Sequence, residues 1–193
     1  TSVANPAHVA AGAQDQGYQV TQGWTQDDDV YEFEQIISGD YAHLTSGDGS
    51  HGVVYSVYPG FILVQYDEDD PQLTYLDYPS GMSHSAWLPP LLADTRDPLN
   101  FFFASDYLYF YRWSGDWWYP ERWSDQDFDA NGGEYISALA FSPLDDERGF
   151  LVTNWGRLFY SSDRGVTWTQ SEDTGPWGQY FYGTALHASS TDV

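Results

Sequence analysis

The sequence contains no cysteine and no lysine, and its apolar runs are short. Without cysteine there is no disulfide framework, no thiolate nucleophile and no zinc–thiolate site. The apolar runs at 61–64 and 101–104 are far shorter than the stretch of about 20 residues that a membrane-spanning helix requires. No basic start followed by an apolar stretch opens the chain, so we expect a mature product or an excised fragment.

Positive charge is also scarce. The chain has 29 acidic residues against six basic ones, all of them arginine, and its formal net charge is −23. Such a chain repels phosphate backbones and anionic lipid surfaces, so we expect no nucleic-acid partner and no membrane insertion. The acidity fits either adaptation to a salt-rich environment or an acidic secreted surface protein.

Salt adaptation predicts that the melting temperature rises with salt concentration, because counter-ions screen the repulsion between the acidic side chains. Thermal melts followed by circular dichroism, from low to molar NaCl, measure this effect. A melting temperature that stays constant over that range would favour the acidic secreted surface protein.

Short β-branched and aromatic runs alternate with clusters of Gly, Asp, Ser and Pro, a pattern that indicates an all-β chain. Residues 150–168 align without a gap on residues 100–118. Residues 53–69 form a third copy, in which Gly60 matches Gly156, and residues 8–20 form a weaker fourth copy. A period of about 45–50 residues is typical of β-propeller blades, each of which is a four-stranded sheet.

We therefore predict about four four-stranded antiparallel units, at residues 8–52, 53–99, 100–149 and 150–179, with residues 180–193 beginning a further blade. Propellers usually close with more blades than this, so we expect the chain to form part of a larger ring. The end units would then pack against further blades of the same parent protein or against an associated chain.

The segment S-S-D-R-G-V-T-W at 161–168 has the composition of a self-contained turn. Asp163 can accept hydrogen bonds from backbone N–H groups of its own turn, and Gly165 supplies backbone angles that other residues avoid. Thr167 suits the strand that follows, and Trp168 buries a large face between sheets. We interpret the segment as a structural turn, which needs no substrate.

The same segment resembles the Asp-box of sialidase-type and sortilin-type β-propellers, also called the BNR repeat, through Ser161, Asp163, Gly165, Thr167 and Trp168. Residues 11–17, 46–49 and 135–143 are similar to weaker patterns of bacterial sortilin-like and xyloglucan-hydrolase-like repeat proteins. The resemblance implies a secreted or cell-surface propeller with the Asp-box at the blade periphery, away from any catalytic centre. No arginine triad of the sialidase kind is found among the six arginines.

The acidic segment 125–134 has the alternating carboxylates of a calcium-binding loop. The glycine expected at its sixth position is replaced by Ala130, and Ile136 stands where a bidentate glutamate would fall. The alternative is an acidic loop whose side chains bond their own backbone. The candidate Ca²⁺ ligands are Asp125, Asp127, Asp129 and Asn131.

Asp15 and Asp48 lie in glycine-flanked turns and form a candidate catalytic pair. Glycoside hydrolysis uses two carboxyl groups, about 5–5.5 Å apart for retention or about 6.5–9.5 Å apart for inversion. The alternative is that each aspartate bonds the amides of its own turn.

Aromatic residues are dense between 107 and 123, and two of them, Trp117 and Trp118, are neighbours. Exposed Trp and Tyr faces stack on sugar rings, whereas buried ones fill the space between blades. Neighbouring residues of a strand point to opposite faces, so Trp117 and Trp118 cannot both point inward. We therefore treat the pair as candidate ligand-binding residues.

The function favoured by these observations is an extracellular binding or scaffold module that recognises protein or glycan, with no cofactor other than the candidate Ca²⁺. The rival is a glycoside hydrolase that uses a carboxylate pair such as Asp15 and Asp48. A propeller of the photosystem-assembly type is a third alternative, which the net charge disfavours because its partners are membrane-bound.

Overall fold

The computed structural model describes residues 9–21, 32–40, 43–47, 52–66, 72–130, 132–175 and 185–191. It divides into two compact units, Thr1–Tyr78 with Ala93–Leu99 and Pro79–Leu92 with Asn100–Val193. The described residues form 15 strands and no helix, so none of their segments is a helix able to cross a membrane. The prediction of an all-β chain is confirmed.

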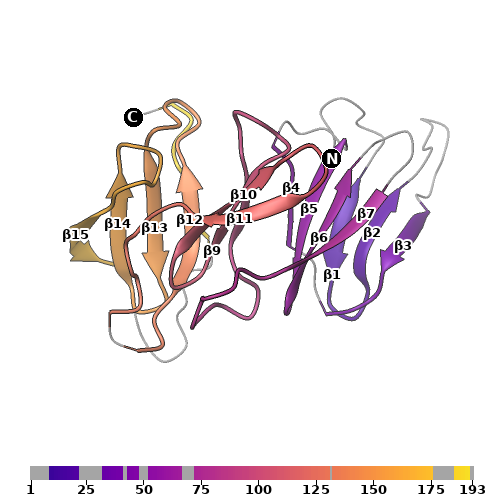
Figure 1. Ribbon diagram of the computed structural model, residues 1–193, viewed down its shortest axis with the longest axis horizontal. Helices are drawn as coiled ribbons and strands as arrows, with labels where there is room; N and C mark the ends of the chain where they lie inside the picture. Colours follow the sequence, from indigo (N-terminus) through magenta and orange to yellow (C-terminus); the bar gives the residue numbers. More distant parts are fainter. Residues whose placement is uncertain are drawn as a thin grey trace. The chain divides into compact units, whose positions relative to one another are not determined.

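The strands form antiparallel sheets in which chain neighbours pair, as Figure 1 shows for each sheet. Three sheets have four strands, and the first has three among the described residues. The first sheet contains β1 (Ala10–Ala13), β2 (Gly17–Thr21) and β3 (Phe33–Ile37). The second contains β4 (His43–Thr45), β5 (Val53–Tyr58), β6 (Phe61–Tyr66) and β7 (Gln72–Asp77). The third contains β8 (Leu91–Ala93), β9 (Phe101–Ala104), β10 (Leu108–Trp113) and β11 (Trp118–Arg122). The fourth contains β12 (Ile136–Phe141), β13 (Gly149–Thr153), β14 (Arg157–Ser161) and β15 (Thr169–Thr174).

The sheets begin one strand earlier than the predicted units. Strands β4, β8 and β12 open the second, third and fourth sheets, yet they fall in the predicted units 8–52, 53–99 and 100–149. The repeat alignment rests on the second and third strands, where the aromatic residues and turn glycines recur, and it does not extend over these first strands. Of the predicted further blade at 180–193, the described residues 185–191 form no strand.

In the first unit, Tyr18 and Tyr58 join the β1–β3 and β4–β7 sheets. The N–H of Tyr18 donates to the hydroxyl of Tyr58 at 2.8 Å, and the hydroxyl of Tyr18 donates to Oε1 of Gln65 at 2.9 Å. Gly17 must be glycine, because its φ is +63° and a Cβ there would lie 2.1 Å from the carbonyl oxygen of Ile37. This polar contact lies within a core that includes Val20 and Leu63.

Burial raises the pKa of Tyr58 from 10.0 to about 12, and it raises the pKa of Tyr18 as well. A raised pKa means that the folded state retains the phenolic proton at a pH where the unfolded chain has lost it. The stability from these groups is therefore complete below about pH 10 and is lost as the pH rises towards about 12. Urea denaturation between pH 8 and 11.5 should give a falling free energy of unfolding. The decline should be shallower in Tyr58→Phe than in the parent chain, because that variant lacks one of the two phenolic protons.

The second unit has an aromatic core between the β8–β11 and β12–β15 sheets. Phe102 lies at its centre, with ring centroids 4.7 Å from Phe110, 4.9 Å from Phe141 and 5.7 Å from Trp123. Leu108, Phe128, Leu139, Leu151 and Phe159 complete the buried cluster. The two sheets are thus joined through one continuous apolar layer.

Candidate functional site

Segment 161–168 forms the turn between β14 and β15, and its polar side chains bond within the turn. The hydroxyl of Ser161 donates to Oδ1 of Asp163 at 2.7 Å and accepts from the N–H of Gly165 at 2.8 Å. Asp163 accepts from the N–H of Thr167 at 2.9 Å and from its hydroxyl at 2.5 Å. Burial would raise the pKa of Asp163, but the bonds from Thr167 and Ser161 outweigh it and lower that pKa. The carboxylate is held inside its own turn.

The apolar side of this turn packs on the core. Trp168 donates from Nε1 to the carbonyl of Gly165 at 2.9 Å and contacts Phe128 edge to face. Gly165 has a φ of +82°, and a Cβ there would lie 3.0 Å from Trp168 and 3.1 Å from Leu108. Both the backbone angle and the space therefore require glycine. Each of the five residues of the pattern has a structural contact here, which accounts for their spacing without a ligand.

Asp163→Ala should lower the free energy of unfolding by about 1–3 kcal/mol, because the amide and hydroxyl of Thr167 lose their acceptor. Urea denaturation measures the loss. The exposed Asp116 in the β10–β11 turn provides a control, and Asp116→Ala should cost less. A folded Asp163→Ala variant of unchanged stability that had lost ligand binding would contradict the structural interpretation of the turn.

A shorter turn, which has a similar bond from a serine hydroxyl to an aspartate, joins β10 and β11. The hydroxyl of Ser114 donates to Oδ1 of Asp116, and the N–H of Trp117 donates to the hydroxyl of Ser114 at 3.2 Å. The gapless repeat alignment places Trp113 opposite Asp163, but the Ser-x-Asp pattern recurs at 114–116, three residues later. The two turns therefore share a local hydrogen bond although they differ in length.

The carboxylates of the acidic loop bond to protein groups. Asp127 accepts from the N–H of Asp129 at 2.8 Å and from the hydroxyl of Tyr107 at 2.9 Å. Asp129 accepts from the N–H of Glu134 at 2.8 Å, and its other oxygen lies 2.7 Å from Nδ1 of His84. The N–H of Glu134, assisted by His84, lowers the pKa of Asp129.

Asp125 is exposed, and Asn131 lies outside the described residues. Among the described residues, no three His, Cys, Asp or Glu side chains are grouped so as to hold a metal ion. The Ca²⁺ site stays a prediction from the sequence.

A buried ion pair fixes the end of this loop to the last sheet. Glu134 is inaccessible to solvent and accepts from Nε of Arg157 at 2.7 Å and from the hydroxyl of Thr153 at 2.5 Å. Arg157 also donates from Nη2 to the carbonyl of Phe128 at 2.7 Å. The sequence gives no sign of this pair, since its partners are 23 residues apart and belong to no motif.

The candidate hydrolytic pair is described at one residue only. Asp15 is exposed in the turn between β1 and β2, with a φ of +63°, a left-handed conformation that Asp tolerates better than most residues. Asp48 lies outside the described residues. The pair stays a prediction.

The neighbouring tryptophans point to opposite sides of the sheet, as alternation requires. Trp118 is 1% exposed and packs against Trp113 with ring centroids 4.2 Å apart, so it offers no free face to a ligand. Trp117 is 43% exposed and Tyr119 is 58% exposed. The binding prediction therefore rests on Trp117, with Tyr119 as a neighbour that the sequence analysis missed.

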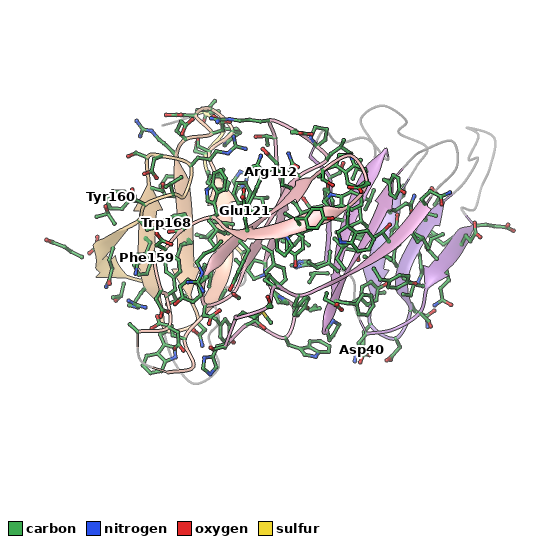
Figure 2. All side chains as sticks on the ribbon, in the orientation of Figure 1. Asp40, Arg112, Glu121, Phe159, Tyr160 and Trp168 are labelled. Carbon is green, nitrogen blue, oxygen red and sulfur yellow. The ribbon has the colours of Figure 1, made fainter. Side chains whose placement is uncertain are left out.

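An ion pair lies on the same face of β10 and β11. Nη2 of Arg112 donates to Oε1 of Glu121 at 2.7 Å, and both side chains are about half exposed. Figure 2 shows Arg112 and Glu121, which this hydrogen bond joins. Arg112 pairs with Tyr119 across the two strands, and Tyr119 and Glu121 are two residues apart, so all three share one face. The alternation of Trp117, Tyr119 and Glu121 was visible in the sequence, but Arg112 required the strand register.

One face of the β12–β15 sheet is open to solvent. Cross-strand pairs place Ala140, Phe150 and Tyr160 on this face, and Leu158 joins them two residues before Tyr160. Phe150 is 40% exposed and Tyr160 is 49% exposed. The four residues, together with residues 186–189, line a pocket of about 510 Å³. We call Ala140, Phe150, Leu158 and Tyr160 the open face.

On the corresponding face of the β8–β11 sheet, the residues at the same positions are buried, whereas Arg112, Tyr119 and Glu121 on that face are exposed. Phe102 pairs with Phe110 across the second and third strands of that sheet, as Phe150 pairs with Tyr160 in the last one. Phe102 and Phe110 are 1% and 3% exposed because the β12–β15 sheet covers them, with Phe159 in the shared cluster. The same surface is thus covered in one repeat and open in the next.

Among solved structures, YCF48 from Cyanidioschyzon merolae, a β-propeller, is similar to this chain, with a TM-score of 0.60 and 18% sequence identity. The match covers 88% of this chain and 55% of that one, so the chain spans about half the length of YCF48. No protein-family model matches the sequence, and no curated protein matches it. At this level of identity the likeness concerns the fold alone. Together with the antiparallel sheets, it confirms the predicted fold class: the chain is all-β and consists of β-propeller blades.

Proposed function

We propose that this chain is a binding and scaffold module whose open face docks another polypeptide. The observation that carries the proposal is the exposure of Phe150 and Tyr160, at 40% and 49%, beside a pocket of about 510 Å³. An apolar surface of this kind is typical of a protein interaction site. The propeller fold supports a binding role, since its blades present surfaces on a rigid framework.

The partner proposed for the open face is a further sheet of the same repeat, from the same parent protein or from an associated chain. Phe102 and Phe110, which hold the positions of Phe150 and Tyr160 in the preceding sheet, pack in one cluster with Phe159 of the following sheet. A sheet that presents a residue like Phe159 would cover the open face in the same way. Covering it would remove two large exposed aromatic side chains from water.

We also propose that segment 161–168 is an Asp-box of the sialidase and sortilin type, with a structural role at the blade periphery. The hydrogen bonds of Ser161 and Asp163 within the turn support that assignment. The net charge of −23 supports a position outside the cell or at its surface, in salt-rich surroundings.

Photo-crosslinking in the native host tests the docking proposal. A benzophenone amino acid at position 160 of the full-length parent protein should cross-link to polypeptide other than residues 186–189, which line the pocket already, either within the parent or in an associated chain. The same amino acid at position 75, where Tyr75 is 54% exposed on β7, serves as the control and should give no comparable product. Cross-linking that is equal at both positions, or absent at position 160, would contradict docking at the open face.

A further inference from the structure

We propose that Trp117, Tyr119, Arg112 and Glu121 form a binding platform for neutral carbohydrate at the solvent-exposed part of the β10–β11 hairpin, next to the covered residue Phe110. We call these four residues the aromatic platform. The inference specifies a ligand class for the proposed binding module, but it uses residues other than those of the open face. A negative result for carbohydrate binding would therefore leave the proposal of polypeptide docking unaffected, and the reverse also holds.

The first argument is the presentation of the two aromatic rings. Trp117 and Tyr119 are two residues apart on one face of an extended chain, which separates their Cα atoms by about 7 Å along the strand. Both side chains are more than two-fifths exposed, whereas the adjacent Trp118 is buried. The negative face of an aromatic ring attracts the positively polarised C–H groups of a sugar ring. Two such rings in a row can hold successive sugar units of a chain.

The second argument is the ion pair beside the rings. The bond between Arg112 and Glu121 uses one of the five N–H groups of the guanidinium and one of the two carboxylate oxygens. A sugar hydroxyl both donates and accepts, and neighbouring hydroxyls match the spacing of a planar guanidinium or a carboxylate. Because the pair orients both groups before binding, little side-chain entropy is lost when the hydroxyls bind.

The third argument concerns charge. Glu121 balances the only arginine of the platform, and the whole chain carries a net charge of −23. A sulfated or carboxylated glycan would therefore be repelled over long range, and it would find no unbalanced cation among the four residues. A neutral glycan escapes this repulsion. Both rings are exposed at the surface, so the platform suits an extended chain of sugars better than a single enclosed one.

Isothermal titration calorimetry of the whole chain tests the proposal. The probes are the neutral hexasaccharides cellohexaose, xylohexaose and mannohexaose, with a heparin hexasaccharide as the anionic comparison. At least one neutral probe should bind, and Trp117→Ala and Tyr119→Ala should each weaken it by about tenfold. Trp117→Phe should retain most of the affinity, and Arg112→Ala should weaken binding as well.

The matched control is Trp155→Ala. Trp155 is 46% exposed, like Trp117, but it lies in the turn between β13 and β14. Its replacement should leave the affinity unchanged, and all variants should remain folded at the temperature of the titrations, as circular dichroism can verify. The proposal is overturned if no neutral hexasaccharide binds at millimolar concentration, if the heparin fragment binds more tightly, or if Trp117→Ala and Tyr119→Ala bind as the parent does. Cross-linking from position 160 is independent of all these outcomes.

Discussion

Arg157→Ala is expected to lower the free energy of unfolding by about 3–5 kcal/mol, because it removes the positive charge that pairs with a buried carboxylate. Glu134 has no exposed surface, and Nε of Arg157 lies 2.7 Å from its Oε1. The hydroxyl of Thr153 also donates to that carboxylate, but it is neutral and cannot balance the charge. The carbonyl of Phe128 would lose a donor in addition.

Urea denaturation of Arg157→Ala, Glu134→Ala and the double variant measures this loss. The double variant should lose less unfolding free energy than the two single variants together, because each single substitution removes one charge of the pair and keeps the other. Arg112→Ala removes the corresponding partner from an exposed pair and should cost at most about 1 kcal/mol. Equal losses of unfolding free energy in Arg157→Ala and Arg112→Ala would show that the buried ion pair contributes no more to stability than the exposed one.

Phe102→Ala is the second change with a large expected effect, about 3–5 kcal/mol of unfolding free energy. Phe102 is 1% exposed, and its ring contacts Phe110, Trp123 and Phe141. Removing it leaves a cavity between two sheets whose strands are held in register by backbone bonds, so the surroundings can collapse only in part. Part of the cost is therefore the cavity itself.

Phe150→Ala is the matched control, since Phe150 holds the position of Phe102 in the next sheet but is 40% exposed. In the chain alone this substitution should cost much less than Phe102→Ala, because surface changes usually alter stability by about 0.5 kcal/mol or less. Denaturation curves of the two variants, recorded under the same conditions, give the comparison. Equal losses would mean that the open face is covered in solution.

The sequence was informative where a structural requirement is local. Gly165 and Asp163 were assigned to a turn because the bonds of such a turn join residues only a few positions apart. The opposite orientations of Trp117 and Trp118 followed from the alternation of a strand. The strand at which each sheet begins could not be predicted, because the repeat alignment covers the second and third strands and a first strand such as β4 has only three residues.

The sequence was uninformative where contacts join distant segments. Asp129 was assigned to a calcium loop from the spacing of its neighbours, yet it contacts His84, 45 residues away. Arg112 and Glu121 are nine residues apart and meet only because of the register between β10 and β11. The exposure of Phe150 could not be inferred either, because the apolar pattern of β13 is the same whether the next sheet covers it or not.

The turn at 161–168 also bears on the order of events during folding. The bonds of Asp163 join residues four positions apart or fewer, whereas the contact of Glu134 with Arg157 closes a separation of 23 residues. Short closures lose less chain entropy, and contacts that are local in sequence form faster. We therefore expect the β14–β15 hairpin to form early in folding. The loop that ends at Glu134 would pack against the last sheet in a later step.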